Sequence, residues 1–116
     1  MNKILEKLKQ GFESSSGKTP EWKEFCKLFK SEFSKELKSI GATDIVFGNG
    51  HFYISGFFTA DSGQIYYFSL SDVRGMEFQN SIDFLYRTAE HYRDWTGGGN
   101  QWIKLEQGMA KRMNIR

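Results

Sequence analysis

The stretch TDIVFGNGHFYISGFFTADSGQIYYFSL, residues 43–70, decides the fold of this chain. Apolar and polar residues alternate along it, and Asn49-Gly50 and Asp61-Ser62-Gly63 interrupt the alternation. A period of two is typical of strands, and short Gly-containing interruptions are typical of hairpin turns. The stretch therefore predicts a three-stranded antiparallel meander, with strands at about 43–48, 51–59 and 64–70.

The first turn sets the expected register of the first hairpin. Asn49-Gly50 favours a two-residue type I′ turn, because that turn needs positive φ at both central residues. Phe47 would then face Phe52, and Ile45 would face Ile54.

The second turn allows two registers. A three-residue loop ending at Gly63, with this glycine in the left-handed conformation, would pair Phe58 with Tyr66 and Gly56 with Phe68. A four-residue loop would move the side chains of the third strand to the opposite faces.

Both faces of the predicted sheet are apolar or aromatic. With the shorter loop, one face carries Ile45, Phe47, Phe52, Ile54, Phe58, Tyr66, Phe68 and Leu70. The other face carries Val46, His51, Tyr53, Phe57, Ile65 and Tyr67. We expect helices to cover at least one face completely, and the sequence leaves open whether they cover the second.

Two helices are expected before the sheet. Apolar residues at near-helical spacing predict an amphipathic helix from about Lys3 to Glu13. The second helix is expected to begin at Thr19-Pro20-Glu21, where Thr can cap it and Pro occupies the first turn, and to end at Gly41. Its apolar stripe consists of Trp22, Phe25, Cys26, Phe29, Phe33, Leu37 and Ile40.

Two further helices are expected after the sheet. The third would begin near Asn80 or Ser81, with Phe78, Ile82, Leu85, Ala89 and Tyr92 on one face. The fourth would begin at Asn100, with Trp102, Leu105, Met109 and Met113 on one face. The sequence therefore predicts a single α+β domain over residues 1–116, in which two N-terminal and two C-terminal helices pack on the meander.

Composition and charge restrict the classes of function. The single cysteine, Cys26, cannot form an intramolecular disulfide, and no run approaches the roughly 18 apolar residues of a membrane span. No apolar secretion signal opens the chain, so a cytoplasmic location without membrane contact is expected. The net charge of +2 is small beside that of a strong duplex-DNA binder, although residues 42–100 are acidic and both flanking segments are basic.

The stretch DWTGGGNQW, residues 94–102, has no counterpart among phosphate-binding motifs, because it lacks the P-loop Lys-Ser/Thr pair and follows a predicted helix. We interpret it as the connection between the third and fourth helices. Three glycines exceed the number that a turn needs, so a partner is expected to approach the backbone here. The candidate interaction residues are Arg93, Asp94, Trp95, Gly97, Gly98, Gly99, Asn100 and Trp102.

An alternative is binding of single-stranded nucleic acid. Aromatic rings on one sheet face would stack on bases, and lysines of the second helix would contact the phosphates. The candidate residues are Tyr53, Phe57, Tyr67, Lys23, Lys27 and Lys30. The same lysines alternate with glutamates, which is also typical of a solvated helix face.

A second alternative is a small hydrolase or transferase in which His91 and Asp94 form an acid–base pair. An i, i+3 pair of this kind more often belongs to a solvated helix face, and Cys26 reads more readily as a small buried hydrophobe than as a nucleophile. The chain has neither CxxC nor HExxH spacing. We therefore assign no catalytic residue, no metal ligand and no cofactor.

Three segments carry a resemblance to known proteins: FYISGFFTADSGQIYYFSLSDVR (52–74), LYRTAEHYRDWTGG (85–98) and GNQW (99–102). They resemble small proteins encoded by phages and conjugative elements of bacteria. The resemblance implies a cytosolic accessory protein of a mobile element. That class includes non-catalytic inhibitors of host defence such as anti-CRISPR proteins. The expected partner is then a host protein or ribonucleoprotein complex.

Overall fold

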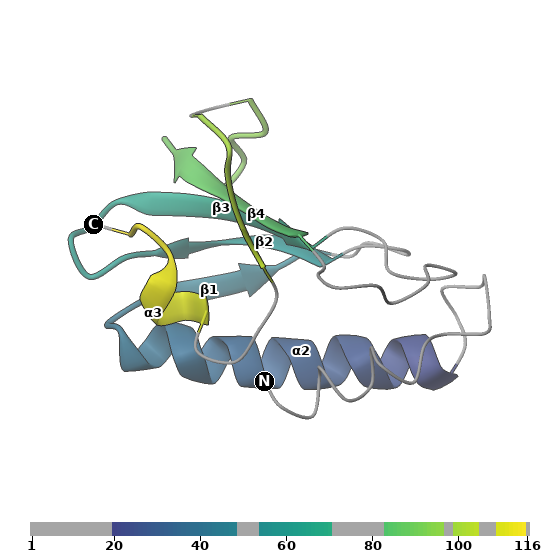
Figure 1. The fold of residues 1–116 in the computed structure, drawn as a ribbon. Coiled ribbons are helices and arrows are strands. Elements are labelled where there is room, and N and C mark those ends of the chain that lie inside the picture. Colours follow the sequence, from purple (N-terminus) through teal and green to yellow (C-terminus); the bar gives the residue numbers. More distant parts are fainter. Residues whose placement is uncertain (1–19, 49–53, 71–82, 97–98, 105–108, 116) are drawn as a thin grey trace.

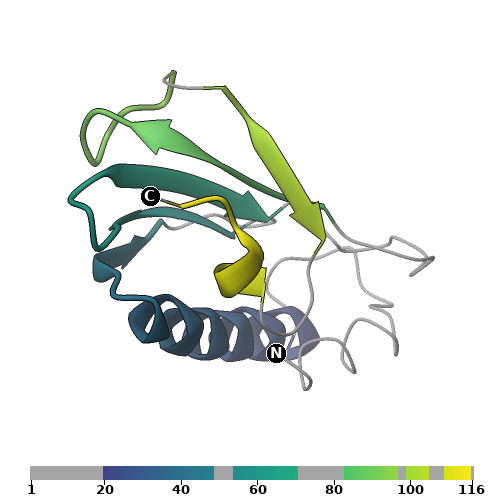
Figure 2. The same cartoon turned by 60° about the vertical axis from the view of Figure 1, so that its left-hand side comes forward.

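The computed structural model describes residues 20–48, 54–70, 83–96, 99–104 and 109–115 (Figure 1). Its elements are α2 (Pro20–Ser39), β1 (Thr43–Phe47), β2 (Ile54–Thr59), β3 (Ile65–Leu70), β4 (Asp83–Ala89), β5 (Gln101–Lys104) and α3 (Met109–Arg112). The strands form one antiparallel sheet in the order β1-β2-β3-β4-β5. Figures 1 and 2 show α2 and α3 on the same side of this sheet. The fold class is thus α+β, as predicted, with more strands than the meander.

Helix α2 begins and ends as the sequence predicts. Pro20 is its first residue, where the missing N–H costs no helical hydrogen bond. At its end, Gly41 has a φ of 87° and donates to the carbonyl of Lys38 (3.1 Å), while Ala42 donates to the carbonyl of Leu37 (3.0 Å). This pair of hydrogen bonds is the Schellman motif, which needs a left-handed residue at the position that Gly41 occupies. The expected helix at Lys3–Glu13 lies outside the described residues.

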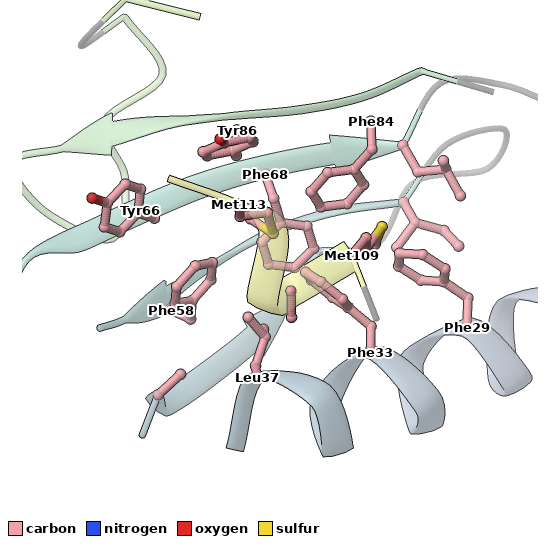
Figure 3. Packing of buried hydrophobic residues seen from close by; sticks show 14 of the residues in the cluster. Phe29, Phe33, Leu37, Phe58, Tyr66, Phe68, Phe84, Tyr86, Met109 and Met113 are labelled. Atoms are coloured by element: carbon pink, nitrogen blue, oxygen red, sulfur yellow. The ribbon is translucent and has the colours of Figure 1, made fainter. Parts of the chain in front are cut away.

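The core lies between α2 and one face of the sheet, called the core face here (Figure 3). Phe33 of α2 is completely buried, and its ring centroid lies 5.1 Å from those of Phe68 and Phe84, in both cases edge to face. This geometry is favourable for aromatic pairs, and large rings fill most of the core. Met109 and Met113 of the α3 region complete it at one side.

The β2–β3 hairpin follows the shorter of the two predicted loops. Phe58 pairs with Tyr66 and Gly56 with Phe68. Gly63 has a φ of 93° and donates to the carbonyl of Ala60 at 2.8 Å. The left-handed glycine therefore fixes this register, as expected.

The predicted register of the β1–β2 hairpin is wrong. Phe47 pairs with Gly56 instead of Phe52, and the amide of Gly48 donates to the carbonyl of Ser55 (2.8 Å). The predicted turn residues Asn49 and Gly50 lie outside the described residues. A β-bulge between Thr43 and Val46 accompanies the shifted pairing. The shift is an even number of residues, so the predicted faces of β1 and β2 are retained.

The third and fourth predicted helices are largely wrong. Residues Asp83–Ala89 form β4 and Gln101–Lys104 form β5, so among the described residues of these two segments only Met109–Arg112 is helical. In β4 the buried Phe84 and Tyr86 point to the core, whereas Leu85 and Arg87 belong to the other face. Aromatic residues suit a pleated surface, and pairing with β3 outweighs the helical spacing of the apolar residues. The proposed caps at Asn80 and Ser81 lie outside the described residues.

Candidate interaction surface

The face of the sheet opposite α2 and α3 is called the open face here, because neither described helix packs against it. Cross-strand pairing places several rows of residues on it, including that of Thr59, Ile65 and Ala89 and that of Asp83 and Lys104, and two other rows lie between these. The first of the two is Val46, Phe57, Tyr67 and Arg87, from β1 to β4. The second row is Ser55, Ser69, Leu85 and Trp102, from β2 to β5.

Exposed apolar side chains gather on this face. In the described part of the chain, the exposed large hydrophobic residues are Val46 (51%), Trp95 (63%) and Trp102 (58%). Val46 and Trp102 belong to the two cross-strand rows, and Trp95 packs on the first row. On the core face, the described large hydrophobic side chains are buried or partly buried, so the exposed ones lie on one side of the sheet.

Trp95 is held at the surface by a loop that follows β4, residues 90–96, called the Trp95 loop here. Its indole meets Phe57 at a centroid distance of 5.3 Å and Tyr67 at 5.9 Å, with interplanar angles of 65° and 80°. The rings therefore make edge-to-face contacts, while more than half of the Trp95 side chain stays exposed.

Arg87 anchors the Trp95 loop to the sheet. Its guanidinium carbon lies 4.5 Å from the ring centroid of Tyr67, and its Nη2 donates to the backbone oxygen of Asp94 at 2.7 Å. Its Nη1 donates to the carbonyl of Thr88 at 3.3 Å. Only 4% of Arg87 is exposed, so its charge positions the loop and is not offered to a ligand.

The carboxylate of Asp94 closes the same loop. It accepts hydrogen bonds from the amides of Glu90 (2.9 Å) and Thr96 (3.1 Å). These backbone hydrogen bonds, with that of Glu90 first, lower the pKa of Asp94 below its ordinary value. Asp94 is thus a capping residue of the loop rather than a contact residue.

The catalytic alternative gains no support from this geometry. The Nδ1 atom of His91 accepts a hydrogen bond from the amide of Arg93 (3.1 Å), and the Asp94 carboxylate is engaged with backbone amides. Burial raises the pKa of the half-buried Cys26 thiol, which disfavours the thiolate form needed for nucleophilic attack. Among the described residues, no group of three His, Cys, Asp or Glu side chains could hold a metal ion.

The predicted interaction residues divide into four groups. Trp95 and Trp102 share the open face and are exposed, whereas Asp94 is buried. Three others are exposed: Arg93, Gly99 and Asn100. Gly97 and Gly98 lie outside the described residues. The glycine segment connects two strands, β4 and β5, so its interpretation as a link between helices is wrong.

The predicted nucleic-acid residues are separated by the sheet. Phe57 and Tyr67 lie on the open face, although Phe57 is only 3% exposed. Lys27 and Lys30 belong to α2 on the other side, where the Lys30 ammonium lies 5.7 Å from the ring centroid of the core-face Phe47. Tyr53 and the side chain of Lys23 lie outside the described part. Rings and lysines therefore do not form one surface.

Sequence reasoning missed Arg87 and Tyr92 as residues that position the loop. Both were assigned to a helix, which hides the fact that Arg87 shares a strand face with Leu85. The alternation of Phe84 and Tyr86 with Leu85 and Arg87 is the signal that indicates Arg87. Tyr92, whose hydroxyl donates to the carbonyl of Asp44 at 2.9 Å, lies beyond the strand and has no such signal.

Among the described residues, two shallow pockets lie away from the two tryptophans. One, of about 380 Å³, is lined by Ile40, Ala60, Asp61, Ser62, Ala110, Lys111, Met113 and Ile115. The other, of about 560 Å³, lies beside the β2–β3 turn, where Gln64 and Thr88 line it. Neither described helix has the length and apolar character that crossing a membrane requires.

Comparison of the chain with protein-family models, with curated proteins and with solved structures finds no match.

Proposed function

We propose that this protein is a non-catalytic binding protein that recognises a partner protein with its open face. It acts as an inhibitor or adaptor of a mobile element, and its partner is a host protein or ribonucleoprotein complex. Inhibition of a host defence complex, in the manner of anti-CRISPR proteins, is the form of this function that the sequence resemblance implies.

The exposed apolar side chains of the open face support this function. Val46, Trp95 and Trp102 all lie on one side of the sheet, although single exposed hydrophobic residues are ordinarily scattered. Tryptophan is enriched among residues that dominate the binding energy of protein interfaces. Two tryptophans that are each more than half exposed therefore suit the centre of a contact surface.

The rigidity of the Trp95 loop supports it as well. Arg87 and Asp94 hold the loop with hydrogen bonds, and Phe57 and Tyr67 hold the indole by its edge. Immobilising a side chain on binding costs about 0.5–1.5 kcal/mol of entropy. A side chain that is already ordered in the free protein avoids much of this cost. Trp95 is thus held in a fixed, exposed position before a partner binds.

A protein partner suits the open face better than a nucleic acid does. Arg87 is the only charged residue in the two cross-strand rows that contain Val46 and Trp102, and its guanidinium is buried and hydrogen-bonded within the protein. The pair of Asp83 and Lys104 on the same face carries one charge of each sign. Strong binding of nucleic acid requires cations that neutralise phosphates. The lysines Lys27 and Lys30 belong to α2 on the opposite side of the sheet.

The test is an affinity capture from a lysate of the source cells, with three immobilised proteins side by side. They are the wild type, the Trp95→Ala/Trp102→Ala variant, and Lys27→Ala as a matched control on exposed α2 surface. We expect the wild type and the control to retain the same protein, and the double variant to lose it. Unfolding curves establish first that all three are folded.

The dependence of capture on salt concentration distinguishes a protein partner from a nucleic-acid partner. Capture of a protein that persists from about 0.15 M to about 1 M salt supports the proposal, because contacts between apolar side chains are not screened. Capture of single-stranded nucleic acid that weakens steeply over this range, and that Lys27→Ala reduces, would overturn it. Equal capture by the wild type and the double variant would also contradict it.

A further inference from the structure

We propose that β5 pairs with β5 of a second copy of this chain, so that two sheets join into one across a two-fold axis. The two edge strands of the sheet, β1 and β5, differ in a way that bears on such pairing. Edge strands present unpaired N–H and C=O groups, and proteins block those that must stay single.

The β1 edge is blocked by its own backbone. A bulge lies between Thr43 and Val46, and Asp44 inside it has a φ of 51°, which a non-glycine residue adopts rarely. The carbonyl oxygen of Asp44 accepts the hydroxyl hydrogen of Tyr92 at 2.9 Å. A bulge interrupts the regular spacing of donors and acceptors that another strand would need.

The β5 edge has none of these features. Gln101–Lys104 pairs with β4 at four successive positions without a bulge. The N–H and C=O groups of alternate residues in such a strand point away from its partner. In the described ranges no strand lies beyond β5, and Trp102 on this strand is 58% exposed.

The sequence of β5 is compatible with its own copy. An antiparallel pair centred on Trp102 places this residue opposite Trp102 of the other copy, and Gln101 opposite Ile103. Lys104, the only charged residue of the strand, then falls opposite Asn100, so no like charges face each other. Cross-strand aromatic pairs stabilise a sheet, whereas like charges directly opposite destabilise it.

The joined sheet leaves the proposed partner surface accessible. A two-fold axis perpendicular to the sheet keeps both open faces on one side and both copies of α2 on the other. The two Trp95 loops would then face the same direction. Trp102 belongs both to this edge and to the open face, but the pairing does not require the proposed function, because the backbone groups of two β5 strands can pair without a bound partner.

The test is the molar mass in solution, measured by sedimentation equilibrium over a concentration series. We expect the wild type to be a dimer and Trp102→Lys to be a monomer, with a dissociation constant raised at least about tenfold, or ~1.4 kcal/mol. Trp95→Lys is the matched control, because Trp95 is equally exposed but packs over β2 and β3. It should remain a dimer.

A mixing experiment tests the register. Trp102→Lys and Trp102→Glu should each be monomeric alone and should form a heterodimer when mixed, because opposite charges then face each other. A wild type that stays monomeric up to about 1 mM, a concentration that corresponds to a dissociation free energy of only about 4.1 kcal/mol, would overturn the proposal. So would a dimer that Trp95→Lys dissociates and Trp102→Lys leaves intact, since that dimer pairs open faces. Should Trp102→Lys fail to fold, Trp102→Glu takes its place, and the comparison of its mass with that of Trp95→Lys decides.

Discussion

The phenolic oxygen of Tyr92 lies 2.9 Å from the carbonyl oxygen of Asp44 and donates its hydrogen to it. The hydroxyl of Thr59 lies 2.5 Å from the same phenolic oxygen. A phenol has a single hydrogen, so Thr59 is the donor in this second bond. One hydrogen bond joins the Trp95 loop to the bulge of β1, and the other joins the loop to the end of β2.

Tyr92→Phe should destabilise the protein by about 1 kcal/mol, because it removes both hydrogen bonds and leaves the carbonyl of Asp44 without its phenol donor. The ring contact with Phe57, at 5.8 Å between centroids, is kept. Urea unfolding of the wild type and the variant measures the difference. Tyr92→Leu, which also loses the ring, should cost more; equal stability of Tyr92→Phe and the wild type would show that the hydroxyl contributes nothing.

Gly56→Ala should destabilise the protein by about 1–3 kcal/mol. A Cβ at this position would overlap the carbonyl oxygen of Val46 and lie 2.8 Å from Cζ of Phe68, so β1 would have to move. Gly99→Ala is the matched control, because a Cβ there meets nothing within 4 Å. In thermal unfolding, the midpoint temperature should be lower than that of the wild type for Gly56→Ala and unchanged for Gly99→Ala. Equal midpoints for the two variants would contradict the close approach of β1 to β2.

Asp94→Asn should reduce stability at neutral pH, and the difference from the wild type should shrink in acid. The folded state holds the pKa of Asp94 below its ordinary value, so it binds protons less readily than the unfolded chain does. Its stabilising effect is therefore complete above the unfolded pKa of about 3.9 and is lost as pH falls through the lower folded pKa. Urea unfolding of both proteins at pH 7 and near pH 3 measures this. A difference that stays constant, or grows in acid, would contradict the assignment.

The sequence predicts the elements whose signals are local. Pro20 and Gly41 define α2 because each fits a terminal helix position for its own backbone geometry. Gly63 likewise defines the β2–β3 register. The faces of the meander follow from a period of two, which survives an even shift of register. These features depend on residues close in sequence, so they can be deduced from the sequence alone.

The remaining elements depend on distant partners. Asn49-Gly50 has the residues of a tight turn, yet the pairing of Phe47 with Gly56 depends on the close approach that a missing Cβ allows. The segment that becomes β4 has helical spacing as well as alternation, and the edge of β3 selects the strand. The sequence places Trp95 and Trp102 at an interaction site. That both lie on the open face can be deduced only once β4 and β5 are known to be strands.

Arg87→Lys should loosen the Trp95 loop, although it conserves the charge. A lysine cannot both stack a planar cation on Tyr67 and donate to the backbone oxygens of Asp94 and Thr88. Loss of hydrogen bonds from a buried charged group costs about 1.5–3 kcal/mol, so urea unfolding should show a decrease in this range. The amide of Thr96, which donates to Asp94 Oδ1, should also exchange its hydrogen faster.

The control for this variant is Arg93→Lys, which changes an exposed arginine of the same loop and should alter neither measurement. If Arg87→Lys unfolds like the wild type and protects the Thr96 amide equally, Arg87 does not anchor the loop. If it lowers stability without faster exchange at Thr96, its effect lies in the sheet beneath Tyr67. Faster exchange at Thr96 together with lower stability is the result expected of a residue that holds Trp95 in place through the backbone of Asp94.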